Sequence, residues 1–283
     1  MKLSLFGLSF LAVLFSPVAS AKTTLVSFGE SSNSFSSPWN LSSGTSTAGV
    51  SGGRTTSALS YSDGSASGVS VSYKNGGLLG TTTPANTTLT SQSANTAIGS
   101  AGLTMWQAAH GQALTDAQIN KGWSENFVLS VGGLAAPGDI VVGGLQKNSS
   151  YTVSAVFTMA NLATLASFSS APVTLEGNGL SVSHAYLTGN GGQIVDLSLG
   201  NVDVLNLLKG GTFMMTWQFT TSSAFTNLDM NFADGVLGVG GGYGVSAIAV
   251  TDGTPNLPVP EPATASLSLL ALGALMLRRR RAA

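Results

Sequence analysis

Short runs in which apolar and polar residues alternate recur through the middle of this chain. In the run 69–73, for example, Val69, Val71 and Tyr73 alternate with serines, and the runs 127–131 and 213–219 repeat the pattern with larger apolar side chains. A period of two is typical of a β-strand with one buried face. Similar runs predict strands at 24–28, 140–142, 151–157, 180–187, 228–232 and 245–250.

About nine strands with one apolar face each bury that face best when two antiparallel sheets pack together. We therefore expect an all-β body, a jelly-roll-like antiparallel β-sandwich. Two short helices are expected beside the strands. The range 113–121 starts with a capping box of Thr115 and Gln118, and 159–168 is a weaker candidate. The segment 31–57 has no clear pattern and is expected to be a long loop.

The first 21 residues have the layout of a secretory signal peptide. A positive start at Lys2 is followed by an apolar run over 3–18 and by the small residues Ala19, Ser20 and Ala21. This layout predicts export through the Sec machinery and cleavage after Ala21. The mature body is then expected to span residues 22–253. A core helix is the alternative interpretation of the same run.

The C-terminal end carries a second predicted targeting signal. Residues 254–262 form a Pro-rich linker, 263–277 are apolar, and 278–283 begin with four arginines. Fifteen helical residues reach about 22 Å, less than the roughly 30 Å of a hydrocarbon core, so we expect a short transmembrane helix. The arginines are expected to stop transfer and to stay in the cytoplasm. An ordinary tail anchor is the alternative. The residues of the linker motif and of the stop-transfer cluster are Val259, Pro260, Glu261 and Pro262, and Arg278, Arg279, Arg280 and Arg281.

The order Pro-Glu-Pro, short apolar helix, arginine cluster and chain end resembles the PEP-CTERM sorting signal of Gram-negative bacteria. The resemblance covers about 25 residues. It implies processing by an exosortase near Pro260-Glu261-Pro262, transient anchoring in the inner membrane, and release to the cell surface or an extracellular matrix. Short body fragments such as Phe28-Gly29 and Tyr243-Gly244-Val245 are similar to the β-sandwich bodies common among such proteins.

Composition and charge exclude several classes of partner. Only 8% of the residues are charged, and between residues 22 and 252 six basic residues face eleven acidic ones, which leaves a net charge of −5. Such a mildly acidic body has no basic patch for nucleic acid or for anionic lipid. Cysteine is absent, so disulfides and thiolate metal sites are excluded.

Catalytic patterns are weak, and we expect the body not to be an enzyme. His184 shares strand parity with Leu180, Val182 and Tyr186, which predicts a half-buried core histidine. His110, before Gly111, is expected to cap or flank a loop. The chain has no Gly-x-Ser-x-Gly elbow. Its carboxylates form no recognisable glycosidase pair; the candidates are Glu125, Asp139, Glu176, Asp196 and Asp203.

Two binding hypotheses remain open beside purely structural roles. Flat aromatic rings stack on sugars, so Trp39, Trp106, Trp123 and Tyr61 are candidates for sugar binding, with core or loop anchoring as the alternative. The oxygen ligands of Asp229, Asn231 and Asp234 lie close together in sequence, so structural calcium is the alternative to strand and turn roles. No other cofactor is expected.

These observations favour an exported structural or adhesive protein of the cell surface or exopolysaccharide. A carbohydrate-binding module is the second hypothesis, and a secreted polysaccharide hydrolase is the third. An extracellular polysaccharide is the expected non-protein partner.

Overall fold

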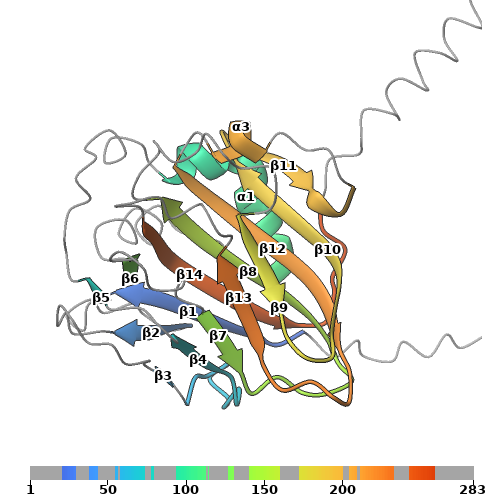
Figure 1. Ribbon diagram of the computed structural model, residues 1–283. Coiled ribbons are helices and arrows are strands. Elements are labelled where there is room, and N and C mark those ends of the chain that lie inside the picture. Colours follow the sequence, from blue (N-terminus) through green and yellow to red (C-terminus); the bar gives the residue numbers. More distant parts are fainter. Residues whose placement is uncertain are drawn as a thin grey trace, which may run out of the picture.

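The computed structural model describes residues 21–29, 38–43, 55–56, 58–73, 78–79, 94–112, 114, 127–130, 140–159, 172–199, 204–208, 211–232 and 242–258. Within these ranges the protein is mostly sheet, with two α-helices, α1 (Ala94–His110) and α3 (Val204–Leu208), and the 3-10 turn η2 (Leu197–Leu199) (Figure 1). None of the helices in these ranges has both the length and the apolar character needed to span a bilayer.

The larger sheet has nine strands. Along its main path the order is β11 (Gln193–Asp196), β10 (Leu180–Gly189), β12 (Thr212–Thr221), β8 (Ser150–Met159), β14 (Gly242–Asp252), β1 (Thr23–Gly29) and β2 (Trp39–Ser43). Beyond this path, β6 (Phe127–Ser130) pairs with β14, and β5 (Leu78–Leu79) pairs with β6. The β1–β2 pair is parallel, whereas the other pairs of described strands are antiparallel.

The smaller sheet has five antiparallel strands. Their order is β3 (Thr55–Thr56), β4 (Ser70–Tyr73), β7 (Ile140–Gly143), β13 (Leu228–Phe232) and β9 (Val173–Glu176). Apolar residues of both sheets form one buried cluster, which includes Val71, Met230, Trp217, Phe157 and Ile248. The two sheets therefore share a core in the manner of a sandwich, and Figure 1 shows the smaller sheet in front of the larger one.

Alternation along the central strands gives the larger sheet a second buried face. Val153 and Trp217 point into the core between the sheets, whereas Ser154 and Thr216 belong to the opposite face. Helix α1 packs against that opposite face and buries a second apolar cluster, which contains Leu25, Ile98, Met105, Trp106 and Met214. The larger sheet is thus covered on one face by the smaller sheet and on the other by α1.

All nine predicted strand runs lie in strands that agree to within a few residues, so the prediction of a sheet-rich body is confirmed. The segment 31–57 is not only loop, since β2 and β3 fall within it. Helix α1 was not predicted. Of the two predicted helices, Met159 ends β8 and Leu114 lies outside a helix, and the other residues of 113–121 and 159–168 lie outside the described residues.

Candidate functional site

The two ends of the described body meet at one end of the larger sheet. Strands β1 and β14 run antiparallel, with Thr23 opposite Thr251. The amide of Asp252 donates to the carbonyl of Lys22 over 2.9 Å, and the amide of Ser62 donates to the carbonyl of Thr23 over 2.7 Å. Residues that follow the predicted signal cleavage therefore lie beside residues that precede the predicted sorting motif.

The side chain of Lys22 is fixed at this end by three neighbours. Its Nζ lies 3.1 Å from Asp63 Oδ2, donates to Ser65 Oγ over 3.0 Å, and sits 5.1 Å from the ring centre of Tyr61. Hydrogen bonds from the Ser65 hydroxyl and amide, with Lys22 beside them, lower the pKa of Asp63 to about 2. If the signal peptide is cut after Ala21, Lys22 is the first residue of the mature chain, and its exposed side chain already contacts Asp63 and Ser65.

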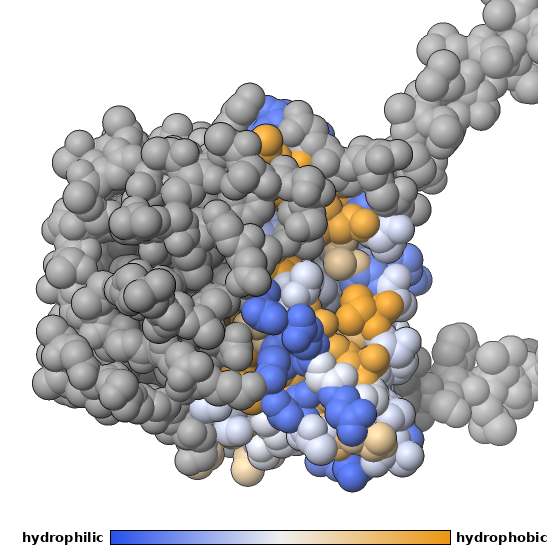
Figure 2. Space-filling view, in the orientation of Figure 1, coloured by the Kyte–Doolittle hydropathy of each residue, from blue (hydrophilic) through white to orange (hydrophobic). Residues whose placement is uncertain are grey.

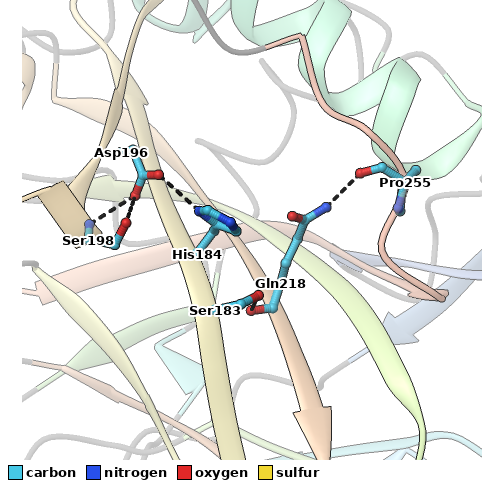
Figure 3. A network of polar contacts seen from close by, with 6 residues as sticks. All are labelled: Ser183, His184, Asp196, Ser198, Gln218 and Pro255. Carbon is cyan, nitrogen blue, oxygen red and sulfur yellow. Dashed lines mark hydrogen bonds and ion pairs between the residues drawn. The ribbon is translucent and has the colours of Figure 1, made fainter. Parts of the chain in front are cut away.

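Residues Gly253–Pro258, which we call the C-terminal segment, lie along the face of the larger sheet that α1 covers. The amide of Gly253 donates to Ser150 O over 2.7 Å, and Thr152 Oγ1 donates to Gly253 O over 2.9 Å. Further along, Gln218 Nε2 donates to Pro255 O over 2.7 Å (Figure 3). The segment thus passes from β14 over β8 toward β12.

Burial alternates along the C-terminal segment. Pro255 and Leu257 are half-buried, while Thr254, Asn256 and Pro258 are exposed. Leu257 packs against the second apolar cluster, the one beneath α1. This is the pattern of an extended chain with one face against the protein. The docked segment ends at Pro258, two residues before Pro260 of the Pro-Glu-Pro motif.

An exposed histidine, His184, stands opposite Gln218 on the neighbouring strand β10. His184 Nδ1 lies 3.0 Å from Asp196 Oδ2, and its ring stacks on Tyr186 with 5.6 Å between ring centres (Figure 3). The net effect of the surroundings is to lower the pKa of Asp196. Partial burial acts to raise this pKa, but the hydrogen bonds from Ser198 and the nearby His184 lower it by more. The prediction of a half-buried core position is wrong, because the His184 side chain is 46% exposed.

The second histidine is at the centre of a buried polar chain. His110 ends α1, and its Nδ1 lies 2.6 Å from Thr251 Oγ1 while its Nε2 lies 2.7 Å from Ser154 Oγ. Thr251 Oγ1 also bonds with Thr23 Oγ1, and Ser154 Oγ with Thr216 Oγ1, each at 2.7 Å. All five side chains are buried, and burial lowers the pKa of His110 to about 3.

Each of the two histidines contacts only one of the two partners that a catalytic triad needs. His110 contacts a serine hydroxyl, but its other nitrogen contacts a threonine rather than a carboxylate, and Ser154 has no exposed surface. His184 has an orienting carboxylate, but Ser198 donates to that same carboxylate instead of contacting the ring. A Ser-His-Asp triad needs all three roles in one accessible place, so neither arrangement makes such a triad.

The structure brings two of the four aromatic candidates together. Trp39 and Trp106 stack with 6.2 Å between ring centres and an angle of 8°. Trp106 has no exposed surface, which leaves it no ring face for a sugar, whereas Trp39 is half-buried. Tyr61 lies beside Lys22 and donates toward Asp252 over 3.5 Å. Trp123 lies outside the described residues.

Two of the three calcium candidates, Asp229 and Asn231, lie on the outward face of the smaller sheet. Asp229 stands opposite Glu176 and accepts from Asn227 Nδ2, while Asn231 Nδ2 donates to Glu176 Oε1 over 3.0 Å. Figure 2 shows hydrophilic residues gathered over β9 and β13. Among the described residues, no group of three or more His, Cys, Asp or Glu side chains could hold a metal ion. Asp234 lies outside the described residues.

The remaining sequence candidates are only partly covered. Ala21 is described and exposed, whereas Ala19, the motif 259–262 and the arginines 278–281 lie outside the described residues. The carboxylate candidates Glu125, Asp139 and Asp203 also lie outside the described residues. The docking of the C-terminal segment could not be predicted from the sequence. In the alternating pattern of its strand, Gln218 looks like any other outward-facing polar residue.

Comparison of the chain with protein-family models, with curated proteins and with solved structures gave no match.

Proposed function

We propose that this protein is an exported structural or adhesive component of the cell surface or exopolysaccharide, sorted and processed through its C-terminal tail. In this proposal residues 1–21 are a signal peptide, residues 263–277 form a short transmembrane helix, and an exosortase acts near Pro260-Glu261-Pro262. The body between them is a non-catalytic, jelly-roll-like sandwich. Localisation is transient at the inner membrane and then extracellular.

One observation carries most of this proposal. The first residues of β1 pair with the last residues of β14, through the hydrogen bond from Asp252 N to Lys22 O. The signal peptide and the C-terminal sorting signal of this proposal are therefore connected to the body at the same end of the larger sheet. A chain held in the membrane by either signal would be attached at that end, with the rest of the sandwich extending away from the membrane.

The polar outward face of the smaller sheet supports a surface role. Its strands alternate between buried apolar residues, such as Leu228 and Met230, and polar residues that face outward, such as Asp229, Asn231 and Glu176. Hydroxyl, amide and carboxylate groups exchange hydrogen bonds readily with hydrated polysaccharide. Such a surface suits a matrix component better than it suits a membrane partner.

Substitutions in the tail test the sorting proposal. Proline lacks a backbone donor and disfavours helix before it, so the motif should stay extended and accessible to a protease. In a host with an exosortase, Glu261→Ala and Pro262→Ala are expected to leave the anchor in place and block processing. Changing Arg278 to Arg281 to serine is expected to misplace the tail. Immunoblots of membrane and shed fractions measure both effects, and Thr264→Ala, next to the motif, is the matched control. Normal processing of Glu261→Ala and Pro262→Ala would contradict the proposal.

The carbohydrate-binding alternative is supported by one observation, the half-buried ring of Trp39 stacked on Trp106. A ring braced in this way would lose little freedom when it stacks on a sugar. If the alternative holds, a glycan array is expected to show saturable binding that falls at least about tenfold in Trp39→Ala. Val182→Ala removes an apolar side chain that is 41% exposed and is the control. Binding that survives Trp39→Ala would remove Trp39 from the site.

A further inference from the structure

We propose that the C-terminal segment, Gly253–Pro258, is a latch: while it is docked on the larger sheet it holds the sorting motif close to the folded body, and its release makes the motif available to the protease. This inference rests on the proposed function, since it concerns the regulation of the same processing step.

The docking contacts involve both backbone and side chains. Gly253 is held by Ser150 and Thr152 of β8, and Pro255 O is held by Gln218 of β12. Leu257 adds apolar contact with the second core cluster. Proline has no amide to donate, so the carbonyl of Pro255 is the group through which that residue can hydrogen-bond, and Gln218 uses it.

The reach of the motif depends on whether these contacts hold. Glu261 is four residues beyond Leu257, and an extended chain spans at most about 3.3–3.6 Å per residue, so a docked segment keeps Glu261 within about 14 Å of the body. Glu261 is nine residues beyond Asp252, so release of the segment extends this reach to about 32 Å. At the longer distance, the folded body hinders the approach of a membrane-embedded protease to Glu261 much less.

Two substitutions loosen the latch from opposite sides. Gln218→Ala removes the donor on β12, and Leu257→Ser weakens the apolar contact from the segment itself. Because Gln218 is 7% exposed, its substitution also touches the body, whereas Leu257→Ser leaves every residue of the sheet unchanged. Gln193→Ala, an exposed glutamine on β11, is the matched control.

The full chain is tested in an exosortase-bearing host by pulse-chase, and the purified full chain by hydrogen exchange of the Gly253 amide, which donates to Ser150 O in the docked segment. We expect processing about fivefold faster in Gln218→Ala, the factor that one net hydrogen bond corresponds to, faster processing in Leu257→Ser as well, and faster exchange of the Gly253 amide in both. Gln193→Ala should match the wild type in both measurements. Equal processing rates in all four chains, or a Gly253 amide that exchanges in the wild type as fast as in Leu257→Ser, would overturn the latch.

These outcomes separate the latch from the proposed function. A wild-type chain that is processed at the same rate as the variants overturns the latch alone. A wild-type chain that keeps its tail overturns the proposed function, and hydrogen exchange then decides the latch: slower exchange than in Leu257→Ser supports docking, and equal exchange overturns it.

Discussion

The protein is expected to lose about 3 kcal/mol of its free energy of unfolding between pH 6.5 and pH 4 through His110 alone. Burial lowers the pKa of this histidine from 6.5 to about 3 in the folded protein. Below pH 6.5 the unfolded chain therefore binds a proton that the folded protein does not. Stability falls as pH falls, by up to about 1.4 kcal/mol per pH unit, and the loss is complete near pH 3.

The contacts of His110 include no charged group that would offset its protonated form. The ring nitrogens contact the hydroxyls of Thr251 and Ser154, and the edge of the ring meets Trp106. These three groups come from β14, β8 and α1, and none of them carries a charge. The two hydroxyls could accept protons from both ring nitrogens, but neither carries the negative charge that would offset a buried imidazolium.

Urea unfolding at several pH values measures this effect. His110→Gln keeps a donor and an acceptor at the end of α1 but cannot titrate, so its stability should fall about 3 kcal/mol less than that of the wild type between pH 6.5 and pH 4. The control is His184→Gln, which replaces the exposed histidine and should keep the acid loss that comes from His110. An identical pH slope in wild type and His110→Gln would contradict the assignment.

Replacing Gly99 with alanine is expected to cost at least about 3 kcal/mol. Gly99 interrupts α1 with φ 65° and ψ 176°, a conformation that L-residues rarely adopt. A Cβ atom there would also lie less than 2.5 Å from the carbonyl oxygen of Gly191, which is backbone and cannot rotate away. The helix would have to move off the β10–β11 hairpin, and its cover over the second core cluster would be lost.

Gly191→Ala provides a close control for this prediction. Gly191 also has a positive φ, 81°, but a Cβ atom there would meet nothing within 4 Å. Its substitution is expected to cost only about 1–2 kcal/mol from the backbone conformation. Urea unfolding of both variants gives the comparison. Equal losses would show that the close approach of Gly99 to Gly191 is not what positions α1.

The strands could be predicted because each carries its own alternation, but the prediction fails where tertiary structure changes the period. On β10 a bulge lies between Val182 and His184, since these residues pair with the adjacent residues Phe219 and Gln218. An extra residue reverses which face the following side chains occupy. His184 therefore does not share the face of Val182, and that part of the parity argument fails. The face alone does not decide burial, however, because Val182 is 41% exposed whereas Tyr186, on the face of His184, is buried.

Helix α1 shows the opposite case, in which a signal was present but local propensity concealed it. Ile98, Met105, Trp106 and Ala109 are spaced like one face of a helix, and all are buried. Gly99 and Gly102 oppose a helix by propensity. At Gly99 the backbone is indeed non-helical, whereas at Gly102 packing overrides the propensity, because this residue allows α1 to approach Thr188 closely. The docking of the C-terminal segment likewise depends on contacts far apart in sequence, such as Gln218 with Pro255.

A strand with one apolar and one hydroxylated face does not reveal what covers the hydroxyls. On β8 and β12 the hydroxylated face includes Ser154 and Thr216, which are fully buried beneath α1. Alternation is the same whether such a face meets water or a helix that carries a matching polar group. The histidine at the end of α1 supplies that group here, so the polar chain could be identified only from the folded structure.

The central claim is that the chain is exported and then processed through its C-terminal tail, and mass spectrometry of the protein shed from its host tests it most directly. The proposal predicts a mature form that starts at Lys22, retains the C-terminal segment, and ends near Pro260-Glu261-Pro262. A shed protein that starts at Lys22 and still carries residues 267–281 would contradict it and indicate an ordinary tail-anchored protein.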